Sequence, residues 1–471
     1  MRRRHRAWLL VGAVTLSTGA CKKGPDYTPP PVAEFQQFRD SITTPESIAN
    51  LTWWELFADT TLQGLIATAV AENRDVRIAL ARIAEARAQA GFVRADLYPR
   101  VDIAGGVSAT EAFNSDGTQV PVRDAFLAAD VFYEVDLWGR ISRSNEAAAQ
   151  ELMASEEAYR SITLTLVSDL GSLYLLLRDL DTRLDISQET YQTRLDAVAI
   201  LQARFDAGVI TEVDVNQAQI ELADAEAAVE VFKRLRTQTE NALSVLMGHT
   251  PEEIRRGLPL TQQTMPPEIP VGLPADLVRR RPDILEAERR LAAQTARIGV
   301  AEALKFPQLS LTGSAGLSDD FTSGGLTSAI LNIGANLFGP LFNAGRNQRR
   351  VDIEVARTEQ LLNRYEQTIL TAFQEVEDAV VAVYTYRAEH ESRVRQVEAA
   401  RNATELSWAR YQGGITSYLE VLDLQRSLFG AELAASETLQ RELSSTVELY
   451  KALGGGWPVR DSLWAVADSL P

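Results

Sequence analysis

The chain of 471 residues is internally duplicated, and this duplication constrains its fold more than any other feature. Residues 204–248 align without a gap on residues 410–454, at an offset of 206. At an offset of 208, the segment that ends at Pro99 aligns on the segment that ends at Pro307. The repeat is far longer than a solenoid unit, so the chain is predicted to contain two similar halves. Matched pairs include Arg204 with Arg410, Gly208 with Gly414, Thr211 with Ser417, Asp214 with Glu420, Gly248 with Gly454, and Ala84 with Ala292.

Each half has the same order of predicted elements, which is helix, strand, loop, strand, long helix and return helix. In the first half, a helical pattern over residues 59–97 ends before Pro99. Two strands separated by a polar loop are predicted within about residues 100–137. The corresponding strands of the second half are predicted within about residues 308–342.

The second predicted strand, at residues 126–137, alternates between two kinds of side chain. An apolar outer face and an acidic inner face are what a water-filled membrane barrel requires. A half-buried hairpin of a soluble protein gives the same local pattern, so both interpretations stay open. One face carries Leu127, Ala129, Val131, Tyr133, Val135 and Leu137, and the other carries Asp130, Glu134 and Asp136.

Two strands per half cannot close a barrel around water, because even a filled small barrel takes about eight strands. The barrel interpretation therefore requires that several copies of the chain contribute strands to one wall.

A very long helix is predicted from near Gly139, since no proline occurs from there to Pro251. About 65 helical residues extend roughly 100 Å, several times the width of a compact domain. The helix is predicted to turn at residues 206–212, with Thr211 capping a second helix that returns to Gly248. Apolar residues that recur every seven positions indicate a coiled-coil seam; they are Leu170, Leu177, Leu184, Tyr191, Val198 and Phe205.

An export signal is predicted at the N-terminus, where residues 1–20 combine basic residues, a short apolar run and small residues. Cys21 is the only cysteine and follows this segment, so we expect it to be acylated and to become the mature N-terminus. An ordinary signal peptide with an incidental cysteine is the alternative, because Thr18 stands where a lipoprotein signal prefers leucine. No later stretch is long and apolar enough to assign a transmembrane helix, so a membrane crossing would require strands closed into a barrel.

The composition argues against other classes of protein. With 47 Lys and Arg against 64 Asp and Glu, the net charge of -17 disfavours binding to nucleic acid. Three His and one Cys offer no stock of ligands for zinc or iron. The sequence carries no nucleophile elbow, P-loop, dinucleotide-binding glycine motif or zinc-protease motif, so no catalytic residue, metal site or cofactor is predicted.

The two alternative functions are an enzyme and a periplasmic lipoprotein adaptor with coiled-coil hairpins. The adaptor would need a lipoyl-like β domain bridging one hairpin, whereas here each of two hairpins has its own pair of strands.

Five segments resemble the TolC-type outer-membrane efflux factors, in particular the lipoprotein branch that serves RND pumps. They are GPDYTPP at 24–30, EVDLWGRISR at 134–143, the segment from RRRPDIL to PQLSL at 279–311, GPLFNAGRNQRR at 339–350, and RYQGGITSYLEVLDLQRSLFGAE at 410–432. The resemblance implies an α+β membrane protein that forms a homotrimer, with a twelve-stranded barrel in the outer membrane and a coiled-coil helical tunnel in the periplasm. It also implies two partners, a periplasmic adaptor and an inner-membrane RND-type pump. Lys22 after the cysteine fits an outer-membrane address in such lipoproteins.

The expected domain organisation follows the repeats. It comprises a signal peptide (1–20), a lipid-anchored tether and equatorial segment (21–58), the first repeat (59–265), the second repeat (266–455) and a C-terminal tail (456–471).

The resemblance also places the functional residues at the ends of the helical hairpins. Leu419 is implied to constrict a gate, Glu420 and Asp423 to form acidic rings, and Arg426 to act as a possible latch. A basic residue that locks the gate in some relatives is replaced by Thr416, so its bond to Asp214 is in doubt. The hairpin tips, implied to contact the adaptor, are Gly208, Val209, Ile210 and Thr211, with Gly414, Ile415, Thr416 and Ser417.

Overall fold

The computed structural model of the protein describes residues 22–31, 54, 57–113, 115–263, 274–320 and 328–455. The chain divides into two compact units. The first comprises residues 1–32, 82–156 and 286–367, and the second comprises residues 33–81, 157–285 and 368–471. Each unit thus takes equivalent parts of both repeats, so the compact units do not coincide with the repeats. The signal segment, Cys21 and the tail at 456–471 lie outside the described residues.

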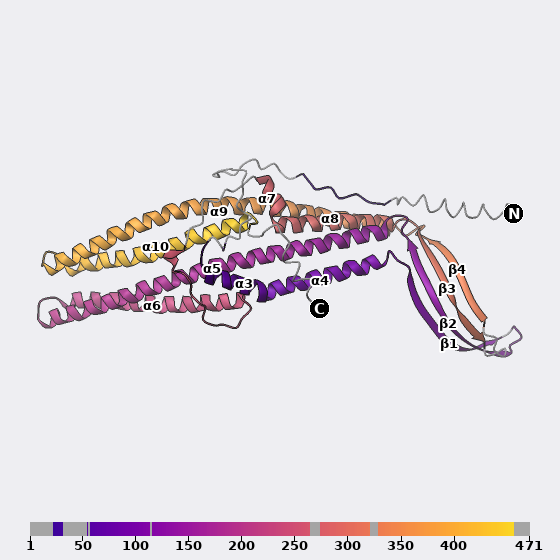
Figure 1. The fold of residues 1–471 in the computed structure, drawn as a ribbon, viewed down its shortest axis with the longest axis horizontal. Coiled ribbons are helices and arrows are strands. Elements are labelled where there is room, and N and C mark those ends of the chain that lie inside the picture. The colour runs from indigo at the N-terminus through magenta and orange to yellow at the C-terminus, as the bar shows by residue number, and fades with distance from the viewer. Residues whose placement is uncertain are drawn as a thin grey trace. The chain divides into compact units, whose positions relative to one another are not determined.

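The first unit contains a four-stranded antiparallel sheet whose strands follow the order of the sequence (Figure 1). The strands are β1 (Arg100–Phe113), β2 (Gln119–Val135), β3 (Gln308–Asp320) and β4 (Ser328–Phe338). Both predicted pairs of strands are confirmed. Pairing of β2 with β3 joins the two repeats, and β1 and β4 form the edges of this sheet.

The ends of β2 differ from the prediction. The strand begins at Gln119, inside the predicted loop, because its ladder with β1 continues until Gln119 lies opposite Phe113. It ends at Val135, so Leu137 lies beyond the strand. Asp136, predicted on the acidic face of the strand, instead accepts hydrogen bonds from the backbone N–H groups of Ile141 (3.0 Å) and Ser142 (2.8 Å). It therefore caps the following helix.

Cross-strand register shows that one face of the sheet is apolar, since residues opposite one another share a face. Val131 lies opposite Val101 of β1 and Gly313 of β3, and Gly313 lies opposite Ile333 of β4. The next row, on the other face, joins Asp102, Asp130, Ser314 and Asn332. That face is mainly polar but also carries Phe126 and Phe132. The predicted separation of faces in β2 is thus confirmed and extends over all four strands.

A helix adjoins each end of both β-hairpins. Helix α4 (Arg74–Ala95) precedes β1 and α5 (Arg140–Asp206) follows β2, while α8 (Pro282–Ala303) precedes β3 and α9 (Arg346–Gln412) follows β4. Both α5 and α9 have 67 residues, which confirms the predicted long helix. Gly139 and Gly345 precede them with φ of +79° and +81°, a backbone conformation that favours glycine.

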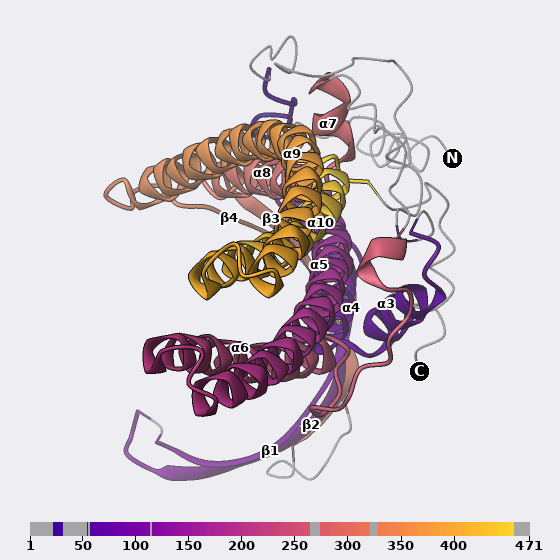
Figure 2. The same ribbon diagram turned by 90° about the vertical axis from the view of Figure 1, so that its left-hand side faces the viewer.

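The second unit contains the return helices, α6 (Glu212–Leu246) and α10 (Tyr418–Ala452), together with α3 (Thr60–Glu72). Two shorter elements, the 3₁₀ turn η2 (Leu260–Gln262) and α7 (Pro274–Arg280), lie in the connection between α6 and α8. Figure 2 looks onto the ends of the two helical hairpins, where α5 turns into α6 and α9 turns into α10. Both predicted helical hairpins are therefore present.

The predicted heptad residues of α5 form part of the core of the second unit. Leu170 and Leu177 are fully buried, with Tyr174 between them, against α3, α6 and α10. Leu184 is also buried, whereas Phe205 near the tip is 37% exposed. Among the described residues, α5 is the one helix with an 18-residue window apolar enough to cross a membrane, but 56% of that window is buried inside the protein. These apolar residues therefore serve as core.

The helix predicted over residues 59–97 is divided into α3 and α4. Asn73 lies between them, and its side-chain oxygen accepts hydrogen bonds from the backbone N–H groups of Asp75 (2.8 Å) and Val76 (3.0 Å). Its amide also donates to the carbonyl oxygen of Leu246 (2.8 Å). Asn73 thus caps α4 and attaches it to the end of α6, a contact that helical periodicity does not reveal.

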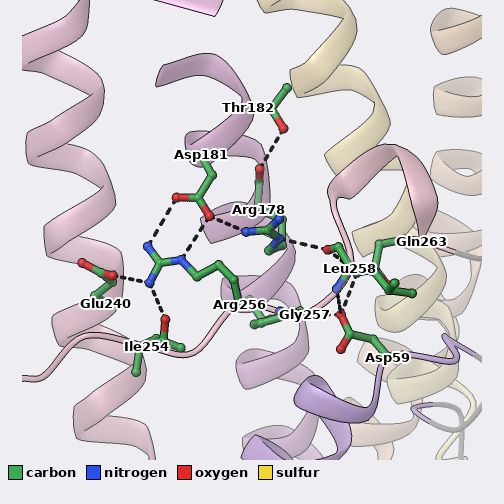
Figure 3. Close-up of polar contacts among 11 residues, drawn as sticks. Asp59, Arg178, Asp181, Thr182, Glu240, Ile254, Arg256, Gly257, Leu258 and Gln263 are labelled. Carbon is green, nitrogen blue, oxygen red and sulfur yellow. Dashed lines mark hydrogen bonds and ion pairs between the residues drawn. The ribbon is translucent and has the colours of Figure 1, made fainter. Parts of the chain in front are cut away.

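Asp59 holds the connection between α6 and α8 against α3 and α5 (Figure 3). Its buried carboxylate accepts hydrogen bonds from Tyr174 (2.9 Å), the backbone N–H of Leu258 (3.0 Å) and the Gln263 amide (2.9 Å). It also caps α3 through the N–H of Thr61 (2.9 Å).

A second set of contacts attaches the same connection to α5 and α6. Arg256 forms ion pairs with Asp181 of α5 (3.2 Å) and with Glu240 of α6, and Arg178 donates to the carbonyl oxygen of Leu258 (3.0 Å) (Figure 3). Residues 256–263 of this connection are therefore fixed by charged side chains.

Candidate functional site: the helical hairpin ends

The two hairpin tips have the same backbone geometry, as their sequence equivalence predicts. Gly208 and Gly414 have φ of +74° and +71°, values that favour glycine. In the first tip, the N–H of Val209 donates to the carbonyl oxygen of Arg204 (3.0 Å). In the second tip, the N–H of Ile415 donates to the carbonyl oxygen of Arg410 (2.9 Å). These bonds satisfy carbonyl groups that each helix end leaves unpaired.

The two return helices are capped differently. Thr211 and Asp214 form a capping box, in which the Asp214 carboxylate accepts from the backbone N–H (3.1 Å) and the hydroxyl (2.8 Å) of Thr211. In the second tip, Ser417 is the N-cap residue of α10 but its side chain forms no capping hydrogen bond, and the Thr416 hydroxyl donates to Glu420. Within the chain, Asp214 is therefore bonded to Thr211 of its own turn, and Thr416 is bonded to Glu420.

The tips expose apolar side chains. Val209 is 70% exposed and Ile415 is 72% exposed. Ile210 instead packs against a buried cluster that includes Leu201 and Tyr411, and thereby joins residues of both hairpins. Each tip thus presents one apolar side chain to its surroundings while the turn itself is well hydrogen-bonded.

The residues expected at the gate lie on the first turns of α10. Leu419 is 53% exposed, and Asp423 and Arg426 are also exposed. Because these three residues are four and three positions apart, they form one stripe along the helix. The carboxylate of Glu420 is partly buried and forms an ion pair with Arg410 (2.8 Å). The two acidic residues expected to act alike therefore differ in their surroundings.

Arg426 forms an ion pair with Glu221 of α6, so it connects the two hairpins. Glu221 is buried and also contacts Arg194 of α5, whose guanidinium donates to the Glu221 carbonyl oxygen (2.5 Å) and lies 3.2 Å from its carboxylate. The hydrogen bond that Arg426 donates to Glu221 and the nearby charges of Glu221 and Asp423 raise the pKa of Arg426. Arg426 thus links the two hairpins through Glu221. The sequence had suggested a latch at Arg426 without identifying its partner.

Sequence reasoning missed Glu221, Arg194 and Arg410. A signal for Glu221 was present, because it falls in the buried stripe of α6 together with Val215, Ala218, Ala225 and Val229. An acidic residue in an apolar stripe requires a buried partner. The stripe does not identify the basic residue that pairs with Glu221. The duplication does not identify it either, because the equivalent of Glu221 in the second repeat is Ser427.

No group of three or more His, Cys, Asp or Glu suited to a metal ion occurs within the described ranges. The hairpin ends combine the exposed apolar residues Val209 and Ile415 with a stripe on α10 that carries Asp423 and Arg426.

Comparison with known proteins places the chain in a family. The outer membrane efflux protein family matches residues 65–249 and again residues 273–455, one match for each repeat. The chain is 34% identical to the probable efflux pump outer membrane protein TtgC of Pseudomonas putida over 96% of both chains. It is likewise 34% identical to the outer membrane protein OprJ of Pseudomonas aeruginosa, over 96% of both chains. A solved structure of the outer-membrane channel OprN superimposes with a TM-score of 0.86 at 30% identity, covering 93% of this chain and 100% of that one.

The chain therefore belongs to the outer membrane efflux protein family, as its sequence motifs predicted. This is a family of outer-membrane transport proteins, so the adaptor interpretation is not supported.

Proposed function

We propose that the protein is the outer-membrane channel of a tripartite efflux system. It would conduct drugs or other small molecules passively from a periplasmic adaptor and an inner-membrane pump to the outside. The observation that carries this proposal is the match of the family to both repeats, combined with a two-faced sheet joined to two 67-residue helices. Relatives named as outer-membrane proteins of efflux pumps support it.

A homotrimer is the proposed assembly. The four strands leave two edges, β1 and β4, and are too few to enclose water. Three copies supply twelve strands, which removes the edges and places the apolar face toward lipid and the mainly polar face toward water. The long helices of three copies would then form the periplasmic tunnel.

A lipid anchor at Cys21 is part of the proposal. The residues that follow it are held tightly on the first unit: the N–H of Lys23 donates to the carbonyl oxygen of Trp138 (3.0 Å), next to the end of β2. Arg143 of α5 donates to the carbonyl oxygen of Lys23 (3.2 Å) and forms an ion pair with Asp26 (2.6 Å). This attachment favours an acyl chain close to the junction of sheet and helices.

The hairpin tips are the proposed contact with the adaptor, and the stripe on α10 is the proposed gate. Val209 and Ile415 are apolar and exposed at the ends of rigid turns, as an interface residue should be. Leu419 and Asp423, repeated by threefold symmetry, would form an apolar ring and an acidic ring around the tunnel.

The test separates channel activity from coupling to the pump. The purified trimer should form ion-conducting channels in planar bilayers, and the protein should confer drug resistance when expressed with its adaptor and pump. Val209→Glu combined with Ile415→Glu should abolish resistance while leaving conductance unchanged, because the charges disrupt only the tip contact. Val245→Glu, at a position that is 62% exposed on the far end of α6, is the control.

Purified protein without conductance would overturn the channel assignment. Full resistance in the double variant would show that the tips do not contact the adaptor.

A further inference from the structure

A hollow of about 430 Å³ lies in the first unit, on one side of the four helices that adjoin the strands. These helices lie side by side in the order α4, α5, α8 and α9. Asn145 of α5 donates to a carbonyl oxygen of α4 (3.4 Å), and Asn347 of α9 donates to the carbonyl oxygen of Leu304 in α8 (2.8 Å). Arg297 of α8 forms an ion pair with Glu151 of α5 (2.8 Å). Because all four helices line one hollow, the row of helices is curved toward it.

The two repeats turn the same face toward this hollow. The offsets that align the repeats, 208 before the strands and 206 after them, match lining residues of the first repeat with lining residues of the second. The matched pairs are Gln89 with Arg297, Ser144 with Arg350, and Glu151 with Arg357. Three arginines of the second repeat therefore stand where the first repeat has neutral or acidic residues.

The segment that follows Cys21 identifies the outer side of these helices. Gly24 approaches Gly299 of α8 so closely that a Cβ atom on Gly24 would lie 2.4 Å from the Gly299 Cα atom. Gly299 is two residues from Arg297 and two from Ala301, hence about 160° around the helix from both of these lining residues. The proposed lipid anchor at Cys21 requires that the Gly299 side be the outer one. The hollow, on the opposite side, then faces the interior of the proposed tunnel.

The charges that line the hollow do not balance. Arg297 is paired with Glu151, and Arg357 forms an ion pair with Glu354 (2.8 Å). Arg350 is exposed, and within the part of the chain that the structure describes it forms no hydrogen bond or ion pair. Three arginines thus face two glutamates, although the whole chain has a net charge of -17. Arg350 is left available to an anion.

Arg350 and Arg357 belong to a basic stripe along α9. At 3.6 residues per turn, the four arginines of this stripe lie within about 40° of one another around the helix, over a length of about 27 Å. No other residue between the first and the last of them falls in that arc. The stripe consists of Arg346, Arg350, Arg357 and Arg364. Three copies of the chain would place three such stripes around the tunnel.

We propose that this stretch of the tunnel binds amphipathic organic anions in transit, that is, molecules with a carboxylate or sulfonate group and an apolar body. The anionic group contacts Arg350, because a guanidinium donates paired hydrogen bonds to such groups. The apolar body lies on the apolar lining of the hollow, which includes Ala147, Val300 and Ala301. The inference rests on the proposed channel function and deepens it by naming a class of transported molecule.

Block of the channel by a defined anion tests the proposal. The probe is 1-naphthalenesulfonate, added to the purified trimer in planar bilayers, and it should reduce the single-channel conductance reversibly. Methanesulfonate has the same charged group without the apolar body, and a naphthyl trimethylammonium cation has the same body with the opposite charge. Both should require at least about tenfold higher concentrations for the same block, because the first buries little apolar surface and the second is repelled by the arginines.

Variants of neighbouring arginines locate the site. Arg350→Gln should raise the half-blocking concentration of 1-naphthalenesulfonate by at least about tenfold, since loss of a charge-assisted hydrogen bond weakens binding by that factor or more. Arg350→Lys should keep most of the block because the charge remains. Arg349→Gln is the matched control: Arg349 is also exposed, pairs with Asp352 (2.9 Å) and does not line the hollow. Arg350 has no partner to lose within the described chain, so its replacement should leave folding and conductance intact.

Each outcome decides a stated claim. Equal block of the unmodified protein and of the Arg350→Gln variant would overturn the anion site. Equal block by the sulfonate and by the ammonium cation would show that apolar contact alone holds the probe, and would overturn the role of the arginines. A channel that conducts but is not blocked by the sulfonate would overturn the inference while leaving the proposed function standing. Protein that does not conduct overturns the channel itself, and the inference with it.

Discussion

Buried carboxylates fix the local structure at two places in the second unit, Asp59 and Glu221. Asp59 is 1% exposed and accepts hydrogen bonds from three separate segments of the chain. Glu221 is 4% exposed and contacts two arginines. Both residues gain enough partners to offset their loss of hydration.

The role of Asp59 predicts a dependence of stability on pH. Burial alone would raise the pKa of this carboxyl group, but hydrogen bonds from Gln263, Tyr174 and backbone N–H groups outweigh burial and hold it below the ordinary value of 3.8. A carboxyl group whose pKa is lower in the folded than in the unfolded protein stabilises the fold at pH values above its unfolded pKa. This stabilisation is lost as the pH falls through the folded pKa.

We therefore expect Asp59→Asn to lower the unfolding temperature by a constant amount above about pH 5, with the difference shrinking below about pH 4. Thermal unfolding of the detergent-solubilised protein from neutral to acidic pH measures this, with Glu85→Gln at an exposed position as control. A difference that does not depend on pH would contradict the assigned role of the carboxylate charge.

Glu221→Gln should destabilise the hairpin ends. The change removes the nearer of the two carboxylates that pair with buried Arg194, at 3.2 Å, and leaves Asp224 at 3.6 Å. The loss should therefore be at most the about 3–5 kcal/mol that leaving a buried charge wholly unpaired costs. The exposed Glu226→Gln on the same helix should change the free energy of unfolding by less than about 0.5 kcal/mol. Denaturant unfolding of both variants provides the comparison, and equal effects would show that the link from Arg194 through Glu221 to Arg426 is not important for stability.

At the scale of single elements, the faces of β2 predict unequal tolerance to charge. Val131→Arg places a cation on the proposed lipid face and should destabilise the barrel by about 2–4 kcal/mol if it lies near the bilayer midplane. Asp130→Arg, on the opposite face, should have a much smaller effect because that side contacts water. The yield of folded trimer in outer-membrane fractions measures both, and equal tolerance would contradict the barrel.

The stripe on α10 predicts how the gate conducts. Asp423→Ala should weaken cation selectivity and block by divalent cations in single-channel recordings, because it removes an acidic ring. Glu420→Gln should have less effect, since Arg410 already offsets that charge. Leu419→Ala should raise conductance with selectivity largely kept. Unchanged selectivity in the Asp423 variant would show that another part of the channel selects cations.

At the scale of the whole molecule, the anchor and the assembly should be separable. Mass spectrometry of the mature protein should find Cys21 at the N-terminus with lipid attached, and an unmodified cysteine there would refute the prediction. Cys21→Ser should reduce targeting to the outer membrane but still allow trimers to form, because strand pairing between copies does not involve the lipid. Membrane fractionation and native gels distinguish the two effects.

The sequence by itself predicted the duplication, the order of strands and helices, the long helices from Gly139 and Gly345, and the apolar face of β2. These features follow from periodicity and from residues such as glycine and proline, which act on their immediate neighbours. The positions of the tips and of Leu419, Asp423 and Arg426 were also available, because the repeat and the family motifs identify them.

Only the tertiary structure showed which groups pair. The division at Asn73, the cap formed by Asp136, the bonding of Asp214 within its own turn and the pairing of Glu221 with Arg426 all depend on neighbouring side chains or on other helices. Glu221 and Arg426 are separated by 205 positions in the chain. A local pattern shows that a side chain is buried or exposed, but the partner of a charged group depends on how distant helices pack, and that is decided only by the folded molecule.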